Sequence, residues 1–368
     1  MLWSLAKGDA GFPELGLTFS DPVVTMLNWG EGRRPAVVFG GGYDLNKDRR
    51  SQENPRNAAP GSDDSEGNAI YIVDAKTGAL VWKAIHGDST GPVSVTTYQH
   101  ALLRDSIPSK VNVIDTDDDG LADRLYVGDT GGVVWRADLA GTDRMQWKLN
   151  PVLSVGRHAG RPDRRFFHRP DFVPASDGDH RFDAILIGSG DREHPLDTNI
   201  HNQFYLFRDR NTVSGEPPAS VKTPGDLDDL TDPAATADPA KAGWYINLGT
   251  SASGEKALAA PVTYRNRVYF SSYVPQGGTV SGQCGPQEGQ SLTYVVNLRD
   301  ASGVFNFDTT TPAHERSVIT GSGIPSSPVV VAVGGNLYIN AGNLPPHPDL
   351  SSPVDRSGMQ RIFWYEKE

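Results

Sequence analysis

The chain has 368 residues, of which 37% are hydrophobic, and it contains 40 glycines and 27 prolines. The net charge of −11 argues against DNA or RNA as a partner, because nucleic-acid binding needs a basic surface. No run of about 20 apolar residues occurs, so we expect no transmembrane segment. The first residues lack the basic and apolar regions of a secretion signal. Many short strands joined by turns would account for this composition.

Five clusters of strand-like segments follow one another along the chain. They cover residues 22–83, 115–137, 166–248, 258–307 and 324–365. Each cluster repeats one plan: a strand that ends in a glycine-rich bend, a Leu/Ile-Tyr-Val/Ile strand, and an aromatic outer strand. Such four-stranded units are the blades of a β-propeller. A two-sheet sandwich is the alternative, but it would not require five similar units. We therefore predict an all-β fold, a modified β-propeller with about five blade units.

The propeller is expected to form a single domain over residues 1–368. Residues 2–5 read as an outer strand that belongs to an earlier blade. We therefore expect this chain to lack the first blades of a larger, seven-bladed propeller. Two strand-free insertions are predicted, at 44–67 and 223–241. The second is acidic and rich in Pro and Ala, which is the composition of a mobile loop.

The clearest chemical motif is the acidic segment 115–123, DTDDDGLAD. Its carboxylates occupy positions 1, 3, 5 and 9 of a calcium-binding loop of the EF-hand type, and position 7 supplies a backbone carbonyl. Alternate side chains of such a tight loop can turn their oxygens towards one hard cation. The predicted calcium ligands are Asp115, Asp117, Asp119, Asp123 and the carbonyl oxygen of Leu121.

Two further residues qualify the calcium prediction. Gly120, at position 6, permits the sharp turn that the loop needs. Tyr126 stands at position 12, where an EF-hand has a bidentate glutamate, and the residues after the loop read as a β-strand. We therefore expect a calcium loop inside a β-protein, with Asp123 coordinating directly. The alternative is an acidic turn without an ion, in which the clustered carboxylates would repel one another.

Residues 73–82 resemble the tryptophan-docking repeat of quinoprotein propellers, and residues 126–135 form a looser copy. In such repeats, tryptophans like Trp82 and Trp135 pack between neighbouring blades. The functional interpretation would be a calcium-dependent dehydrogenase that uses pyrroloquinoline quinone. The chain has one cysteine, Cys284, so the vicinal cysteine pair found beneath such a quinone is missing.

Catalytic motifs are absent from the sequence. It has no H-E-x-x-H, no G-x-S-x-G elbow that leads from a strand into a helix, and no phosphate-binding glycine loop that leads into a helix. His194 is the one histidine in a dense polar group. It could form a catalytic dyad with Asp191, but a turn network in which Arg192 pairs across blades is the favoured interpretation. We therefore predict that the protein is not an enzyme and has no catalytic residues.

Several segments together resemble one family over nearly the whole chain and in the same order. They are residues 37–43, 115–139, 187–195, 243–248, 254–263 and 323–328. These segments resemble the PilY family, the type IV pilus tip-associated biogenesis proteins and adhesins. The resemblance implies the C-terminal domain of that family, a modified β-propeller with a surface calcium loop.

The resemblance also implies a role. The expected function is regulation of pilus extension against retraction, twitching motility and surface attachment. The expected partners are the type IV pilus with its minor pilins and a host or abiotic surface. The expected location is the extracellular pilus tip or the outer-membrane surface. The family's N-terminal region, often with a von Willebrand A-like domain, is not recognisable here. The alternative function is the calcium-dependent quinoprotein oxidoreductase.

Overall fold

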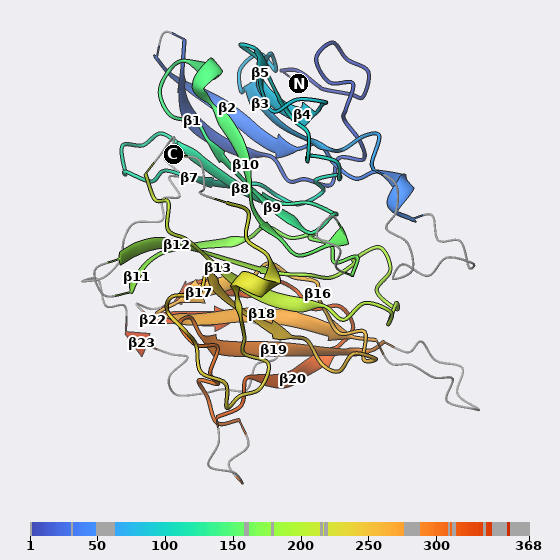
Figure 1. Ribbon diagram of the computed structural model, residues 1–368, viewed down its shortest axis with the longest axis vertical. Helices are drawn as coiled ribbons and strands as arrows, with labels where there is room; N and C mark the ends of the chain where they lie inside the picture. Colours follow the sequence, from blue (N-terminus) through green and yellow to red (C-terminus); the bar gives the residue numbers. More distant parts are fainter. Residues whose placement is uncertain are drawn as a thin grey trace.

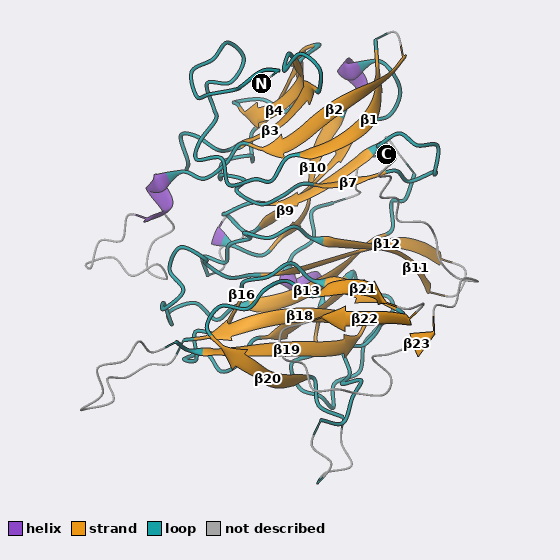
Figure 2. Cartoon of the chain, turned by 180° about the vertical axis from the view of Figure 1, so that it is seen from behind, coloured by secondary structure: helices purple, strands orange, loops and turns teal. Residues whose placement is uncertain are grey.

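The computed structural model describes residues 2–30, 32–48, 63–157, 162–177, 180–213, 216, 220–275, 288–307, 310, 314–333, 336–340 and 352–353. The described part is built almost entirely of short strands, which form five sheets (Figures 1 and 2). Three short 3-10 turns accompany them, η1 (Leu45–Asp48), η2 (Arg144–Gln146) and η4 (Pro224–Asp226). Among the described residues, no helix has the length and apolar character of a membrane span.

The first sheet has the strand order β1-β2-β3-β4-β6-β5. Its strands are β1 (Val23–Trp29), β2 (Gly32–Gly40), β3 (Ala69–Asp74), β4 (Leu80–His86), β5 (Gly91–Ser94) and β6 (Thr97–His100). Neighbouring strands are antiparallel except for β4 and β6, which are parallel. The turn between β3 and β4 is the first of the two tryptophan-docking motifs, and it places Trp82 in a fully buried position.

The second sheet has the order β10-β9-β8-β7 and is wholly antiparallel. Its strands are β7 (Asn112–Ile114), β8 (Arg124–Gly128), β9 (Val133–Asp138) and β10 (Lys148–Ser154). Every residue of β8 and β9 is buried, because both faces of this sheet are covered by neighbouring sheets. The predicted calcium loop connects β7 to β8.

The third sheet has the order β11-β12-β13-β15-β14, and the fourth the order β16-β18-β19-β20 with β17 paired to β18. The third contains β11 (Asp171–Asp177), β12 (His180–Gly188), β13 (Gln203–Asp209), β14 (Asp228–Asp229) and β15 (Gly243–Asn247). The fourth contains β16 (Lys256–Ala257), β17 (Val262–Tyr264), β18 (Arg267–Val274), β19 (Gln290–Asn297) and β20 (Ser317–Ser322). The fifth contains β21 (Val329–Val333), β22 (Asn336–Asn340) and β23 (Ser352–Pro353).

Consecutive sheets pack face to face, and apolar residues fill each interface. Trp82 and Trp135 belong to one cluster between the first and second sheets, as the docking motifs predicted. A second cluster joins the second sheet to the third. Between the third and fourth sheets, the rings of Phe204 and Phe270 stack with centroids 3.8 Å apart. Sheets that pack in series in this way are the blades of a propeller, not the closed strands of one barrel.

The strand predictions need three corrections. Residues 303–307 form only isolated bridges, and β20 is the outer strand of the fourth sheet. No strand was predicted at β10, which completes the second sheet. The 223–241 insertion contains η4 and β14, and its Leu227 and Leu230 are buried, so it packs as part of the third blade. The strand predicted at 361–365 and Cys284 lie outside the described residues.

Candidate metal-binding site

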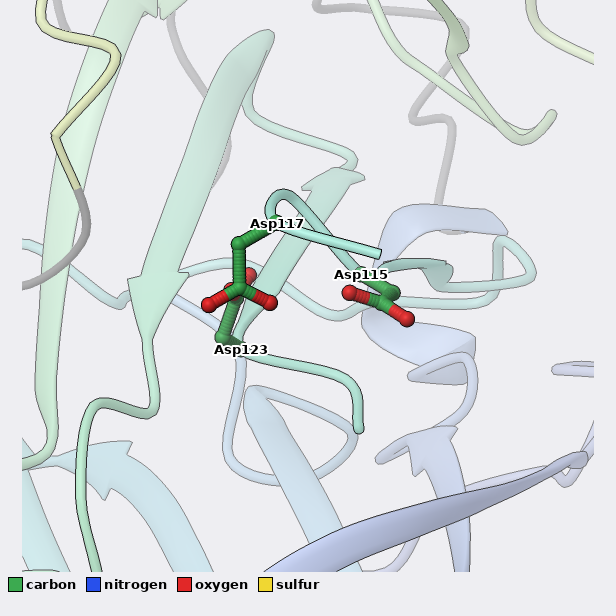
Figure 3. Close-up of side chains that lie close together, drawn as sticks. All are labelled: Asp115, Asp117 and Asp123. Atoms are coloured by element: carbon green, nitrogen blue, oxygen red, sulfur yellow. The ribbon is translucent and has the colours of Figure 1, made fainter. Parts of the chain in front are cut away.

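The loop between β7 and β8 gathers carboxylates at one point (Figure 3). Oxygens of Asp115, Asp117 and Asp123 lie within 4.8 Å of one another. Calcium binds oxygens at 2.3–2.6 Å, so two of its ligands are at most about 5 Å apart. The three side chains therefore have a spacing that fits one calcium ion. Asp117 is exposed and the other two are half-buried, which leaves the cluster open to solvent.

The backbone of the loop winds around Asp115. The Asp115 carboxylate accepts hydrogen bonds from the backbone N–H groups of Asp118 at 2.8 Å, Asp119 at 3.2 Å and Gly120 at 2.8 Å. Gly120 has a φ of 83°, a left-handed conformation that glycine adopts without strain. The motif therefore folds into the tight turn that its spacing predicted.

Asp123 closes the loop onto its beginning. Its carboxylate accepts hydrogen bonds from the hydroxyl of Thr116 at 2.6 Å and from the Thr116 backbone N–H at 3.2 Å. Its own N–H donates to the carbonyl of Ile114 at 3.0 Å. Burial raises the pKa of the Asp123 carboxyl to about 6, while the Thr116 hydrogen bonds act in the opposite direction.

Asp119 points differently from the other three predicted acids. Its carboxylate accepts a hydrogen bond from the N–H of Leu121 at 2.8 Å and lies 3.8 Å from the guanidinium of Arg33. It is not one of the three converging carboxylates. The ligand role of Asp119, like that of the Leu121 carbonyl, stays a prediction. The side chain of Leu121 is buried and anchors this end of the loop.

The loop also contacts the first sheet. The N–H of Ala122 donates to the carbonyl of Met26 in β1 at 2.8 Å, and Arg33 donates to the carbonyl of Asp119 at 3.0 Å. Arg33 belongs to β2, so the loop spans the junction between the first two blades. A change in the shape of the loop would therefore alter contacts between the first and second sheets.

Tyr126, the residue at position 12, has a structural role. It is fully buried, and its hydroxyl donates to Asp209 at 2.9 Å. Burial and the Asp209 charge raise its pKa well above the usual value. The side chain thus faces the third sheet and not the acidic loop.

Sequence reasoning missed a buried charge cluster between the second and third sheets. Arg136 binds Asp138 at 2.7 Å and Asp209 at 2.8 Å, and Arg124 binds Asp138 at 3.2 Å and also Asp183. Both arginine side chains are 0% exposed. We call these five residues the arginine network. Its only sequence signal was the presence of Arg124 and Arg136 within otherwise apolar strands.

A second buried cluster lies where the loops of the first three sheets meet. The ammonium of Lys47 is 3.2 Å from Asp64 and also binds Asp105, which Arg157 contacts at 2.8 Å. Burial raises the pKa of Asp64. Because the charges of this cluster are paired within the protein, it is best explained as structural.

The structure partly confirms the turn network predicted around Asp191. His194 lies 2.9 Å from the Asp191 carboxylate, which also accepts from the N–H of Glu193 at 3.1 Å. The cationic partner of Asp191 is Arg165, at 3.5 Å, and among the described residues no ion pair of Arg192 across blades is found. Arg165 comes from the segment before β11, where no sequence motif marked it.

No protein-family model matches the chain. It is 26% identical over 323 residues to the type IV pilus biogenesis factor PilY1 homolog of Xylella fastidiosa, a match that covers 79% of this chain and 19% of that protein. It is 32% identical over 131 residues to PilY1 of Pseudomonas aeruginosa strain UCBPP-PA14, covering 36% of this chain and 8% of that protein. The crystal structure of the Pseudomonas aeruginosa PilY1 C-terminal domain matches with a TM-score of 0.66 and 18% identity, over 92% of this chain and 73% of that one.

The chain is similar to PilY1 proteins in sequence and in fold. Its fold is the modified β-propeller of the PilY1 C-terminal domain, as the sequence predicted. It spans about a fifth of the length of the Xylella relative. The acidic loop and the arginine network are thus features of a PilY-type propeller.

Proposed function

We propose that this chain is the calcium-binding propeller of a type IV pilus biogenesis factor and tip adhesin. The observation that supports this function is the similarity to proteins named type IV pilus biogenesis factor PilY1 over 79% of the chain. In this proposal the propeller acts outside the cell, at the pilus tip or the outer-membrane surface. Its partners are the pilus, with its minor pilins, and the surface to which the cell attaches.

The acidic loop supplies the calcium part of the proposal. Asp115, Asp117 and Asp123 would hold the ion, and Asp119 and the Leu121 carbonyl would complete the oxygen shell. Bound calcium would neutralise clustered carboxylates that otherwise repel one another. No nucleophile or general base adjoins the loop in the sequence, so the site is suited to shape control and not to catalysis.

We propose that the loop regulates pilus extension against retraction, and with it twitching motility. The support is its position, because it binds both β1 and β2 of the neighbouring blade through Ala122 and Arg33. A ligand shifts a conformational equilibrium only if it binds the two states differently. Ordering this junction would change the surface that faces the pilus or its retraction machinery.

The test uses the full-length protein in the bacterium that encodes it. Asp123→Ala should imitate the calcium-free loop, and Asp123→Lys should partly imitate the occupied loop because it places an ammonium at the site. Surface piliation and twitching should then change in opposite directions in the two variants, with secretion unchanged. Asp88→Ala removes an exposed acid outside the loop and serves as the matched control. Wild-type piliation and twitching in both Asp123 variants would contradict the regulatory role and reduce the loop to a structural element.

The alternative function as a quinoprotein oxidoreductase gains no support from the described residues. The two tryptophans that suggested it, Trp82 and Trp135, are buried between the first and second sheets. The indole N–H of Trp135 donates to Asp129 at 2.7 Å within the same blade. The motif therefore reports how blades pack, and the named relatives are pilus factors.

A further inference from the structure

A cavity of about 430 Å³ lies at the end of β13 and is separate from the acidic loop. One wall is the end of that strand, and the other is formed by residues of the segment between β13 and β15. The residues that matter for its chemistry are Arg208, Asp209, Arg210, Lys222, Asp226 and Lys241. Four of these six side chains are basic, although the whole chain has a net charge of −11.

Backbone hydrogen bonds fix the wall that carries the lysines. The N–H of Lys222 donates to the carbonyl of Val152 at 2.9 Å, and its carbonyl accepts from Ser154 at 2.8 Å, both in β10. The N–H of Ala242 donates to the carbonyl of Asp226 at 3.0 Å. The cavity is therefore a built feature between two blades, and its basic residues are held in place.

The two carboxylates of the lining are already engaged. Asp209 belongs to the arginine network, where it binds Arg136 at 2.8 Å and accepts from Tyr126 at 2.9 Å. Asp226 accepts hydrogen bonds from the N–H of Thr223 at 2.8 Å and from its hydroxyl at 3.0 Å. Asp209 is thus neutralised within the core, while Asp226 keeps one negative charge near the cavity.

The basic side chains are less well compensated. Arg210 pairs with Asp177 at 2.7 Å, outside the cavity lining. The Arg208 guanidinium donates to three backbone carbonyls, and burial lowers its pKa. Lys222 and Lys241 donate to a serine hydroxyl and a backbone carbonyl, and within the described residues no carboxylate lies at ion-pair distance from either ammonium. Within the lining, Arg208 and the two lysines therefore carry two more positive charges than the one remaining carboxylate, Asp226, can balance.

We propose that this cavity binds a phosphate group, either as the inorganic ion or as a phosphate monoester. A phosphate carries about −1.5 to −2 charges at pH 7, which matches the excess. Lysine and arginine are the side chains that bind phosphate most strongly. The volume leaves room beside the phosphate for a small substituent such as a sugar ring. This inference is independent of the proposed pilus function.

The test titrates the purified chain with potassium phosphate in calcium-free buffer at fixed ionic strength, followed by NMR chemical shifts. Lys222→Glu and Lys241→Glu should each weaken phosphate binding at least tenfold. Lys76→Glu changes the charge equally at an exposed turn in the first sheet, and it should bind phosphate within twofold of the wild type. Glucose 6-phosphate is titrated in parallel, and the tighter of the two ligands identifies the source of the phosphate.

Two results would overturn the proposal. One is that potassium chloride at the same ionic strength produces the same shifts as phosphate. The other is that Lys222→Glu and Lys76→Glu bind phosphate equally well. If Lys222→Glu fails to fold, Lys222→Gln keeps the backbone bonds to β10 and should still lose affinity several-fold.

Discussion

Two groups of carboxylates meet at the start of β8, and they differ in how their charge is balanced. Asp123 ends the acidic loop, and the next residue, Arg124, begins the arginine network. The network pairs three buried carboxylates with two guanidinium groups inside the protein. In the loop, three partly solvated carboxylates converge with no cation paired to them among the described residues, and a fourth acid, Asp119, lies near the exposed Arg33. The charge of the network is balanced within the protein, whereas the open charge of the loop is where we propose that an external ion binds.

Burial separates the two cases. A buried ion pair that loses one member leaves an uncompensated charge in a poorly solvated site, which costs several kcal/mol. When a solvated acid loses its ionic partner, water solvates its charge again, so the free energy of unfolding changes little. Loss of a residue of the arginine network should therefore lower the free energy of unfolding with or without calcium. Loss of an acid of the loop should lower it only when calcium is bound.

The largest effect is expected from Arg136→Ala. The substitution leaves one guanidinium, that of Arg124, for the three buried carboxylates, and it should lower the free energy of unfolding by about 3–5 kcal/mol. Urea unfolding followed by tryptophan fluorescence measures this loss. Arg181→Ala removes an exposed arginine from β12 and should change stability by no more than about 0.5 kcal/mol. If the two variants were equally stable, a buried arginine of the network would contribute no more to stability than an exposed one, and the comparison would fail.

Calcium itself should give the next largest effect. At a free concentration of about 100 times the dissociation constant, it should stabilise the wild type by about 2.7 kcal/mol. Asp115→Ala and Asp123→Ala should abolish both this gain and the binding heat in calorimetry, because each removes a converging carboxylate. Arg136→Ala should keep the gain, since the network shares no side chain with the loop. Undiminished binding in both aspartate variants would remove the metal assignment.

Magnesium should compete poorly for the loop. Its small octahedral shell keeps several waters and fits a flexible oxygen loop badly, so we expect its affinity to be at least about tenfold below that of calcium, or about 1.4 kcal/mol. Competition calorimetry measures the ratio. Equal affinities would mean that the acids attract divalent charge without any selective geometry.

The smallest effect is expected from Arg33→Ala. The ion pair with Asp119 is exposed on both sides, and such pairs contribute about 0–1 kcal/mol. Loss of a positive charge beside the loop should raise calcium affinity by about twofold. Arg34→Ala, one residue along β2, provides the matched control. If Arg33→Ala lost much stability and Arg34→Ala did not, the ion pair of the loop would contribute as much as the buried pairs of the arginine network.

The blade pattern was predictable from sequence because it is local. Alternating strands, glycine bends and the docking tryptophans indicated five units, and five sheets are present. The acidic loop was equally local, since nine consecutive residues contain its whole pattern. Edge elements such as β10 and β20 escaped prediction, because their sequences lack the Leu/Ile-Tyr-Val/Ile signal and are held by pairing with neighbours.

The arginine network could not be predicted, because its members come together only in the folded chain. Arg124 and Asp183 are separated by 59 residues, and Arg136 and Asp209 by 73. For the same reason, the pairing of Asp191 with Arg165, 26 residues away, could not be predicted, because spatial approach decides it.

The hydrogen bond from Ala122 to Met26 bears on the solubility of the propeller. β1 is the terminal strand of the first sheet, and Val24 and Met26 on it are exposed. An uncovered edge with apolar side chains is a template on which a second copy could add a strand. The acidic loop occupies one carbonyl of that edge, that of Met26. A second copy that added a strand here would have to displace this hydrogen bond, so the loop that we propose to hold calcium should also oppose self-association of the blade.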